Sequence, residues 1–332
     1  MVMTRDAPLQ SSARISTKCL PKRLSPLQRE ALSRIYRRPR NRSITCLEGR
    51  SLLVDLLRTT TRDGVQLDGA FQAPAGPKPS PLGIDGFCLI HGTGGNFYSS
   101  SLFAELAERL LQLGSAVLRV NTRGHDGIST AVTAQGGKRL GAAYEIIDDC
   151  RHDVAAWIDL LRERVGPRIG LVGHSMGAVK ALYAVAHEPA LAPTALVAIS
   201  PPRLSYAAFC ASASADQFLE TYRCAERLVA SGGPATLMEV QLPLPYVITA
   251  AGYVEKYGPE ERYNFLKLLP GIACPVLITL GGKEEDLEAL VARTSSVKTE
   301  IIPDADHFYT AVRGELVDRI ESWLGSNRGT VR

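Results

Sequence analysis

A strand–turn–helix pattern around Ser175 constrains this chain more than any other stretch. Residues 169–172 form a short apolar run typical of a buried strand, and residues 178–185 have helical spacing. Between them, Gly173-His-Ser-Met-Gly177 has the Gly-x-Ser-x-Gly pattern. A serine on so sharp a turn needs neighbours without a Cβ, because strand and helix must pass close together. The pattern therefore predicts that Ser175 is a nucleophile exposed above the end of a buried strand.

A serine hydroxyl reacts only when a base takes its proton and an acid orients the base. For this pattern the order along the chain should be serine, acid, histidine. His307 follows the last apolar strand and precedes the final helix, so it is the predicted base. The other histidines lie at positions 91, 125, 152, 174 and 187. We expect these to be structural, except that His125 stays open as a competing base.

The acid is predicted in the loop after the apolar strand at 275–280. This strand runs into Gly281-Gly-Lys-Glu-Glu-Asp286, which contains three consecutive acids. A carboxylate three residues after the first glycine is Glu284, which we favour. Spacing alone leaves Glu285 and Asp286 open.

The chain alternates between strand-like and helix-like runs. Expected strands lie at 51–59, 65–73, 87–90, 115–120, 169–172, 195–199, 275–280 and 298–302, with a hairpin turn at Asp63-Gly64. Expected helices lie at 102–113, 142–165, 178–185, 286–292 and 308–324. The 142–165 helix would bury Ile146, Val154, Trp157, Ile158 and Leu161. Such alternation indicates an α/β protein with a mostly parallel sheet, covered by helices on both faces, and a site at the carboxyl ends of its strands.

The alternation lapses between Arg203 and Gly271. This stretch is rich in aromatic residues, and its helix-like runs are broken at Gly232-Gly-Pro234 and near Pro243. We therefore expect a mostly helical insertion here.

Taken together, these motifs resemble the α/β-hydrolase fold over residues of about 50–325. The resemblance rests on His91-Gly-Thr93, Gly173–Gly177, Cys274–Glu284 and Asp306-His307. It implies a core of residues 46–202 and 272–327, with residues 203–271 as a helical cap. It also implies an oxyanion hole made by the backbone N–H groups of Thr93 and Met176, with Gly94 as the alternative to Thr93. The acid in this family is usually Asp, so Glu284 is a departure. A more distant similarity is to siderophore esterases.

Composition separates the first 45 residues from the rest. The chain has 332 residues, of which 45% are hydrophobic and 22% charged, as is typical of a soluble globular protein. Residues 1–45 carry a net charge of +9, whereas the whole chain carries +4. This basic leader is expected to be a disordered extension, and a transit peptide or a nucleic-acid-binding arm stays open.

Other sequence features bear on location and ligands. The seven cysteines are scattered, and Cys88 and Cys274 are expected to be reduced, which favours the cytoplasm unless the leader directs the chain to an organelle. No apolar run has the length of a membrane span. No metal-binding or cofactor-binding motif is present, so we expect neither, and no nucleic-acid partner.

The predicted function is a serine hydrolase that cleaves a small apolar carboxylic ester through an acyl-enzyme. Ser175, Glu284 and His307 would form its catalytic triad. Two alternatives stay open. One is a non-catalytic receptor that uses the same pocket, and the other is an acyltransferase, lactonase or amidase that uses the same triad. The oligomeric state is not predicted.

Overall fold

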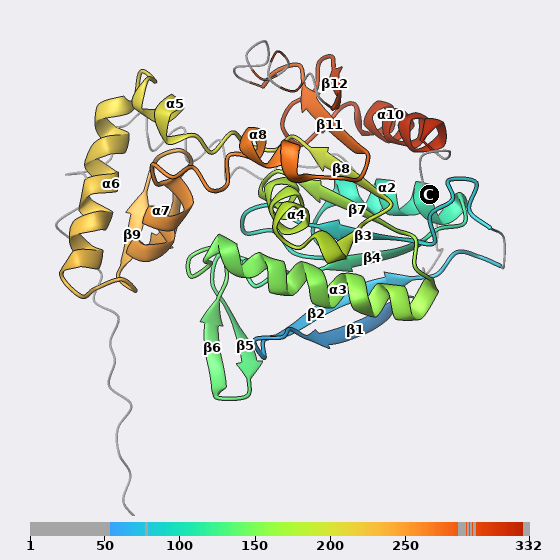
Figure 1. Cartoon of the computed structure of the whole chain (residues 1–332), viewed down its shortest axis with the longest axis horizontal. Coiled ribbons are helices and arrows are strands. Elements are labelled where there is room, and N and C mark those ends of the chain that lie inside the picture. Colours follow the sequence, from blue (N-terminus) through green and yellow to red (C-terminus); the bar gives the residue numbers. More distant parts are fainter. Residues whose placement is uncertain are drawn as a thin grey trace, which may run out of the picture.

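The computed structural model describes residues 54–76, 79–284, 290, 292, 294 and 297–327. At its centre lies an eight-stranded sheet with the order β1-β2-β4-β3-β7-β8-β11-β12 (Figure 1). The strands are β1 (Asp55–Thr60), β2 (Gln66–Gln72), β3 (Gly86–Ile90), β4 (Ala116–Val120), β7 (Ile169–His174), β8 (Ala195–Ile199), β11 (Val276–Gly281) and β12 (Lys298–Ile302). β2 is antiparallel to both of its neighbours, and the other pairs are parallel. The expected mostly parallel sheet is confirmed.

Helices cover both faces of this sheet. α3 (Cys150–Val165) and α4 (Met176–His187) pack on one face, and α2 (Ser101–Gln112) and α10 (Arg313–Ser326) pack on the other. Strand β3 serves both cores, because Cys88 and Ile90 point to the first face while Phe87 and Leu89 point to the second. Burial on both faces explains why this strand is apolar throughout and does not alternate.

Two regions lie outside the eight-stranded sheet (Figure 1). One is a hairpin of β5 (Ser129–Thr133) and β6 (Gly136–Leu140), which the sequence reading missed. The other is the segment at 203–271, between β8 and β11. It holds α5 (Tyr206–Cys210), α6 (Ala215–Ala230), α7 (Ala250–Tyr257) and α8 (Phe265–Leu268), and also an antiparallel pair, β9 (Leu237–Val240) and β10 (Tyr246–Thr249). The mostly helical insertion expected for this segment did not include that strand pair.

The helix expected at 142–165 begins later than predicted. A short 3₁₀ turn, η2 (Ile147–Asp149), precedes α3, and Ile146 is extended with φ −98° and ψ 120°. The reason is that the backbone before it is already bonded elsewhere. The N–H groups of Ala142 and Ala143 donate to the carbonyls of Asp126 and Gly127, and the carbonyl of Ala143 accepts from Thr249. Ile146 therefore does not belong to the helix.

The final helix also begins later than expected. Residues before Arg313 form turns, because Tyr309 has a φ of 53°, which an α-helix does not allow. Its ring is fully buried.

Several expectations fall outside the described residues. These concern the basic leader at 1–45, the first residues of the strand at 51–59, Glu285, Asp286 and most of the helix at 286–292. Cys88 and Cys274 are free thiols, as expected. Cys224 on α6 is disulfide-bonded. Within the described part of the chain, no helix is long and apolar enough to cross a membrane.

Candidate active site

Ser175 lies on the tight turn between β7 and α4. Its backbone has φ 56° and ψ −126°, a conformation that a residue with a side chain rarely adopts. The two glycines of the motif make this turn possible. A Cβ at Gly173 would lie 2.3 Å from the Gly177 carbonyl oxygen, and one at Gly177 would lie 2.1 Å from the Ile90 oxygen. Strand and helix pass close together at both glycines, which is the reason predicted for them.

His307 contacts Ser175 from the loop after β12. Its Nε2 lies 2.9 Å from the Ser175 Oγ, within ordinary hydrogen-bond distance. This is the geometry that a base needs to accept the serine proton. His125, the competing candidate, instead pairs through Nδ1 with Asp126 at 2.9 Å. The structure thus brings His307, and not His125, to the serine.

Glu284 lies on the other side of the His307 ring. Its Oε1 is 3.6 Å from the His307 Nδ1, which is longer than an ordinary hydrogen bond. Burial would raise the pKa of this carboxyl, but His307, the Ser200 hydroxyl and the Gly281 N–H lower it below its ordinary value. The carboxylate form is therefore favoured beside the imidazole.

Two residues that the sequence reading missed hold Glu284. The Ser200 hydroxyl donates a hydrogen bond to the Glu284 carboxylate, and its oxygen lies 2.8 Å from the Tyr309 hydroxyl. Since the Ser200 proton is directed to the carboxylate, Tyr309 must donate to Ser200. Ser200 follows β8, which is the neighbour of β11 in the sheet. Its place at the carboxyl end of a central strand was the available signal.

His174 positions the backbone of His307. Its Nε2 lies 2.8 Å from the His307 carbonyl oxygen, so this nitrogen carries the proton and donates it. Burial lowers the pKa of His174 to about 4, which keeps the ring neutral at physiological pH. This agrees with the expectation that His174 shapes the backbone.

The loop at 91–95 passes directly beside the serine. A Cβ at Gly92 would lie 3.0 Å from the Ser175 Cβ, so the loop depends on glycine at this point. Among the described residues, none accepts a hydrogen bond from the backbone N–H groups of Thr93 and Met176. The Gly94 N–H, the alternative donor, is also unpaired within the described residues.

A buried polar chain supports this loop from behind. His91 donates from Nδ1 to the Gly92 carbonyl at 2.8 Å, and its Nε2 accepts from the Thr122 N–H at 3.1 Å. These bonds fix the tautomer, and burial lowers the pKa of His91 to about 3. Lys180 on α4 donates to the Thr122 hydroxyl at 3.1 Å and lies 2.5 Å from Glu145.

Both members of the Lys180–Glu145 ion pair are fully buried. Burial would raise the pKa of Glu145, but Lys180 and then Lys256 lower it below its ordinary value. A buried charge is tolerated only when it is paired in this way. The pair therefore fixes Lys180, whose hydrogen bond to Thr122 links α4 and its serine turn to His91 and the loop at 91–95.

Two hollows open at Ser175, and both are also lined by Thr93, His307 and Leu244. The larger hollow, of about 490 Å³, extends over Asn96, Ser99 and Phe308. The smaller hollow, of about 270 Å³, extends under the 203–271 segment. Its further lining includes Arg203, Leu204, Phe209, Pro243 and Tyr257. The nucleophile thus has room on two sides.

No cluster of metal-ligating side chains occurs in the described parts of the chain. Neither hollow is lined by a carboxylate.

Comparison with known proteins agrees with this geometry. Residues 89–319 match the family model described as the alpha/beta hydrolase family. The chain belongs to the alpha/beta hydrolase family. The match includes Ser175, Glu284 and His307, and membership supports a hydrolase activity. No curated protein sequence matches this alpha/beta hydrolase significantly.

Solved structures share the fold of this alpha/beta hydrolase at low sequence identity. Est1E from Butyrivibrio proteoclasticus, solved with ferulic acid bound, has a TM-score of 0.57 and 20% identity, covering 81% of this chain and 98% of its own. The Pyrococcus furiosus esterase PF2001 has a TM-score of 0.52 and 21% identity, covering 84% and 92%. The alpha/beta hydrolase GrgF from Penicillium sp. sh18 has a TM-score of 0.61 and 14% identity, covering 83% and 99%. At these identities the likeness concerns the fold.

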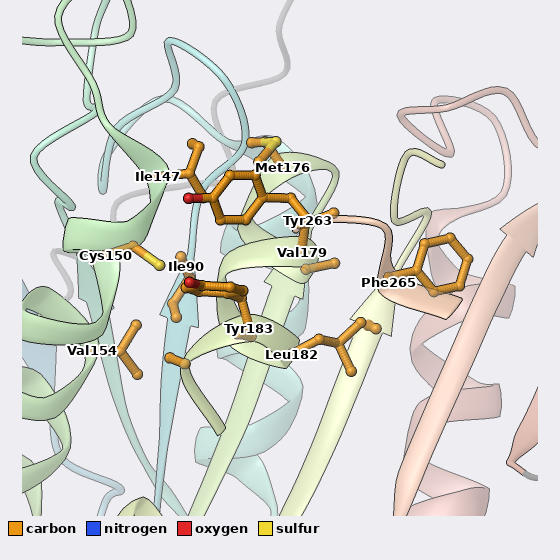
Figure 2. Close-up of a cluster of buried hydrophobic side chains, with 14 of the residues drawn as sticks. Ile90, Ile147, Cys150, Val154, Met176, Val179, Leu182, Tyr183, Tyr263 and Phe265 are labelled. Carbon is orange, nitrogen blue, oxygen red and sulfur yellow. The ribbon is translucent and has the colours of Figure 1, made fainter. Parts of the chain in front are cut away.

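The helix that carries the serine turn is embedded in the core of this alpha/beta hydrolase. Figure 2 shows its side chains between those of η2 and α3 on one side and those of the 203–271 segment on the other. The side chains from α4 are Met176, Val179, Leu182 and Tyr183, and their neighbours include Ile147, Cys150, Val154, Tyr263 and Phe265. Tyr183 and Tyr263 meet edge-to-face with ring centroids 4.7 Å apart. Because α4 packs on all sides, the position of Ser175 is fixed by the core.

Proposed function

We propose that this protein is a serine hydrolase that cleaves a carboxylic ester through an acyl-enzyme. The observation that carries the proposal is the 2.9 Å approach of the His307 Nε2 to an Oγ held on a strained turn, with Glu284 behind the ring. Family membership supports the hydrolase class.

In this proposal, His307 takes the Ser175 proton as Oγ attacks the ester carbonyl carbon. The negative charge that develops on the carbonyl oxygen is stabilised by the N–H groups of Thr93 and Met176, which are unpaired within the described residues. The imidazolium then protonates the leaving alcohol. A water molecule, deprotonated by His307, releases the acid and restores the serine. Glu284 stabilises the imidazolium in both steps.

The 203–271 segment would act as a cap over the serine. Its residues Leu204, Phe209, Leu244 and Tyr257 line the smaller hollow together with Ser175. An apolar wall of this kind excludes water from the reacting carbonyl and favours a small apolar ester.

The test is hydrolysis of a graded series of 4-nitrophenyl acyl esters by the wild type and by Ser175→Ala. We expect kcat to fall by about 10⁴–10⁶-fold, because triad residues act as a unit. Ser326→Ala, at an exposed serine near the end of α10, is the matched control and should retain full activity.

Labelling with a fluorophosphonate probe tests the nucleophile without a substrate. Wild-type protein should be labelled at Ser175, and Ser175→Ala should not. Folded wild-type protein that neither turns over any ester nor reacts with the probe would overturn the proposal and favour a receptor.

A further inference from the structure

Arg203 is the one permanent charge among the described residues that line the two hollows. Arg203 is the fourth residue after the end of β8 and follows Ser200-Pro-Pro. It lines the smaller hollow together with Ser175 and Met176. The rest of that lining is mostly apolar: Leu204, Phe209, Leu244 and two prolines.

The Arg203 guanidinium has no partner within the described chain. Its Nε is buried and makes no hydrogen bond, and no described carboxylate lies within ion-pair distance of the side chain. Leaving such a donor buried and unpaired is unfavourable.

Arg123 provides the contrast within the same molecule. This buried arginine is paired with three carboxylates, those of Asp63 at 2.9 Å, Asp149 at 2.9 Å and Asp153 at 2.8 Å. The charge of this buried guanidinium is therefore neutralised by its three carboxylate partners. Arg203 lacks such neutralisation and lies where a substrate would bind.

We propose that Arg203 binds a carboxylate group of the substrate, so that the ester cleaved at Ser175 is part of an otherwise apolar acid. This inference rests on the proposed function. A guanidinium presents parallel N–H donors that match the two oxygens of a carboxylate, and the pair is strengthened in an apolar hollow. The smaller hollow has a volume of about 270 Å³ and one guanidinium in its lining, so it would pair with one carboxylate of the substrate. The carboxylate belongs either to the acyl part or to the alcohol part of the ester.

Paired esters distinguish the two positions. For the acyl part, 4-nitrophenyl hydrogen adipate is compared with its terminal amide. For the alcohol part, 4-acetoxybenzoate is compared with 4-acetoxybenzamide. Each pair keeps shape and changes only the charge. In one of the two pairs, we expect the wild type to have a higher kcat/KM for the acid than for the amide. The ratio of these two kcat/KM values should fall by about 10- to 100-fold in Arg203→Met. Arg203→Lys should retain part of it.

Arg313→Met is the matched control. Arg313 also has a buried Nε without a hydrogen bond, but it lines neither hollow. Its removal should leave the preference for the acid unchanged. Loss of the preference in both variants would show a general effect of net charge and would overturn the assignment to Arg203.

Binding separates this inference from the proposed function. Calorimetric titration of the same esters into Ser175→Ala needs no turnover. A preference for the acid that disappears in Ser175→Ala/Arg203→Met supports the carboxylate site even if the wild type hydrolyses nothing. Hydrolysis of the neutral esters at Ser175 with no preference for either acid, in rate or in binding, would overturn the carboxylate site and leave the hydrolase intact.

Discussion

The two sides of Ser175 are supported in different ways. On one side, His91 is 3% exposed and rests on a buried ion pair through Thr122 and Lys180. On the other side, the His307 side chain is 36% exposed, and its supports are the Glu284 carboxylate and the hydroxyls behind it. The difference follows from what each histidine has to do. His91 only holds a backbone loop, so it is best kept neutral and rigid. A base must exchange protons, so His307 stays open to the hollows.

This comparison predicts where a substitution affects chemistry and where it affects stability. Changes on the His307 side should lower turnover with little effect on unfolding. Changes on the His91 side should lower stability, since they expose or unpair buried charge.

The largest effect is expected at Glu284. In Glu284→Gln the side chain keeps its size but no longer carries the charge that stabilises the imidazolium, so kcat should fall by about 10⁴-fold. Steady-state kinetics on a 4-nitrophenyl ester measures this, with a urea titration to show that stability is retained.

The neighbouring acids are the controls for Glu284. Glu285→Gln and Asp286→Asn remove a carboxyl at the positions that spacing alone leaves open, and each should retain near wild-type kcat. A large loss in either one, with Glu284→Gln active, would reassign the acid.

The next effect is expected at Lys180. Lys180→Met leaves Glu145 buried without its nearest cation, which should lower the free energy of unfolding by about 3–5 kcal/mol. Replacing both members, as Lys180→Met/Glu145→Leu, should recover part of this loss, because neither charge of the pair is then left buried without the other. Urea denaturation measures all three proteins.

Lys298→Met is the surface counterpart of Lys180→Met. Lys298 is 57% exposed and lies 3.5 Å from Glu300, so its removal should cost about 0–1 kcal/mol. If Lys180→Met costs no more than this, the buried pair does not anchor the His91 side.

The parts of the molecule that follow from local sequence were predictable, and those that depend on neighbouring strands were not. The serine turn, His307 and Glu284 could be named because each follows an apolar strand at a characteristic spacing. Ser200 and Tyr309 could not. The Ser200 hydroxyl reaches Glu284 because β8 and β11 are adjacent in the sheet, and the Tyr309 hydroxyl reaches Ser200 because the chain after β12 turns at Tyr309.

The same reasoning applies to the fold. A helical pattern from 142 onward is present in the sequence, yet the first residues bond to Asp126 and Gly127, and the helix starts at Cys150. The β5–β6 hairpin was missed because its strands are mostly exposed and polar and lack a buried apolar face.

The smallest effect is expected at Tyr309. Its hydroxyl bonds to Ser200, which in turn donates to Glu284. Tyr309→Phe therefore removes a positioning contact that is separated from the His307 imidazole by Ser200 and Glu284. One hydrogen bond of this kind contributes about 0.5–1.5 kcal/mol, which corresponds to roughly a 2- to 10-fold fall in kcat. KM should stay the same, because Tyr309 lines neither hollow. The ring remains to fill the core, so a fall in kcat that is matched by a rise in KM, or by a loss of stability alone, would mean that Tyr309 is only a packing residue. An effect confined to kcat would show that the contacts that support His307 extend as far as Tyr309.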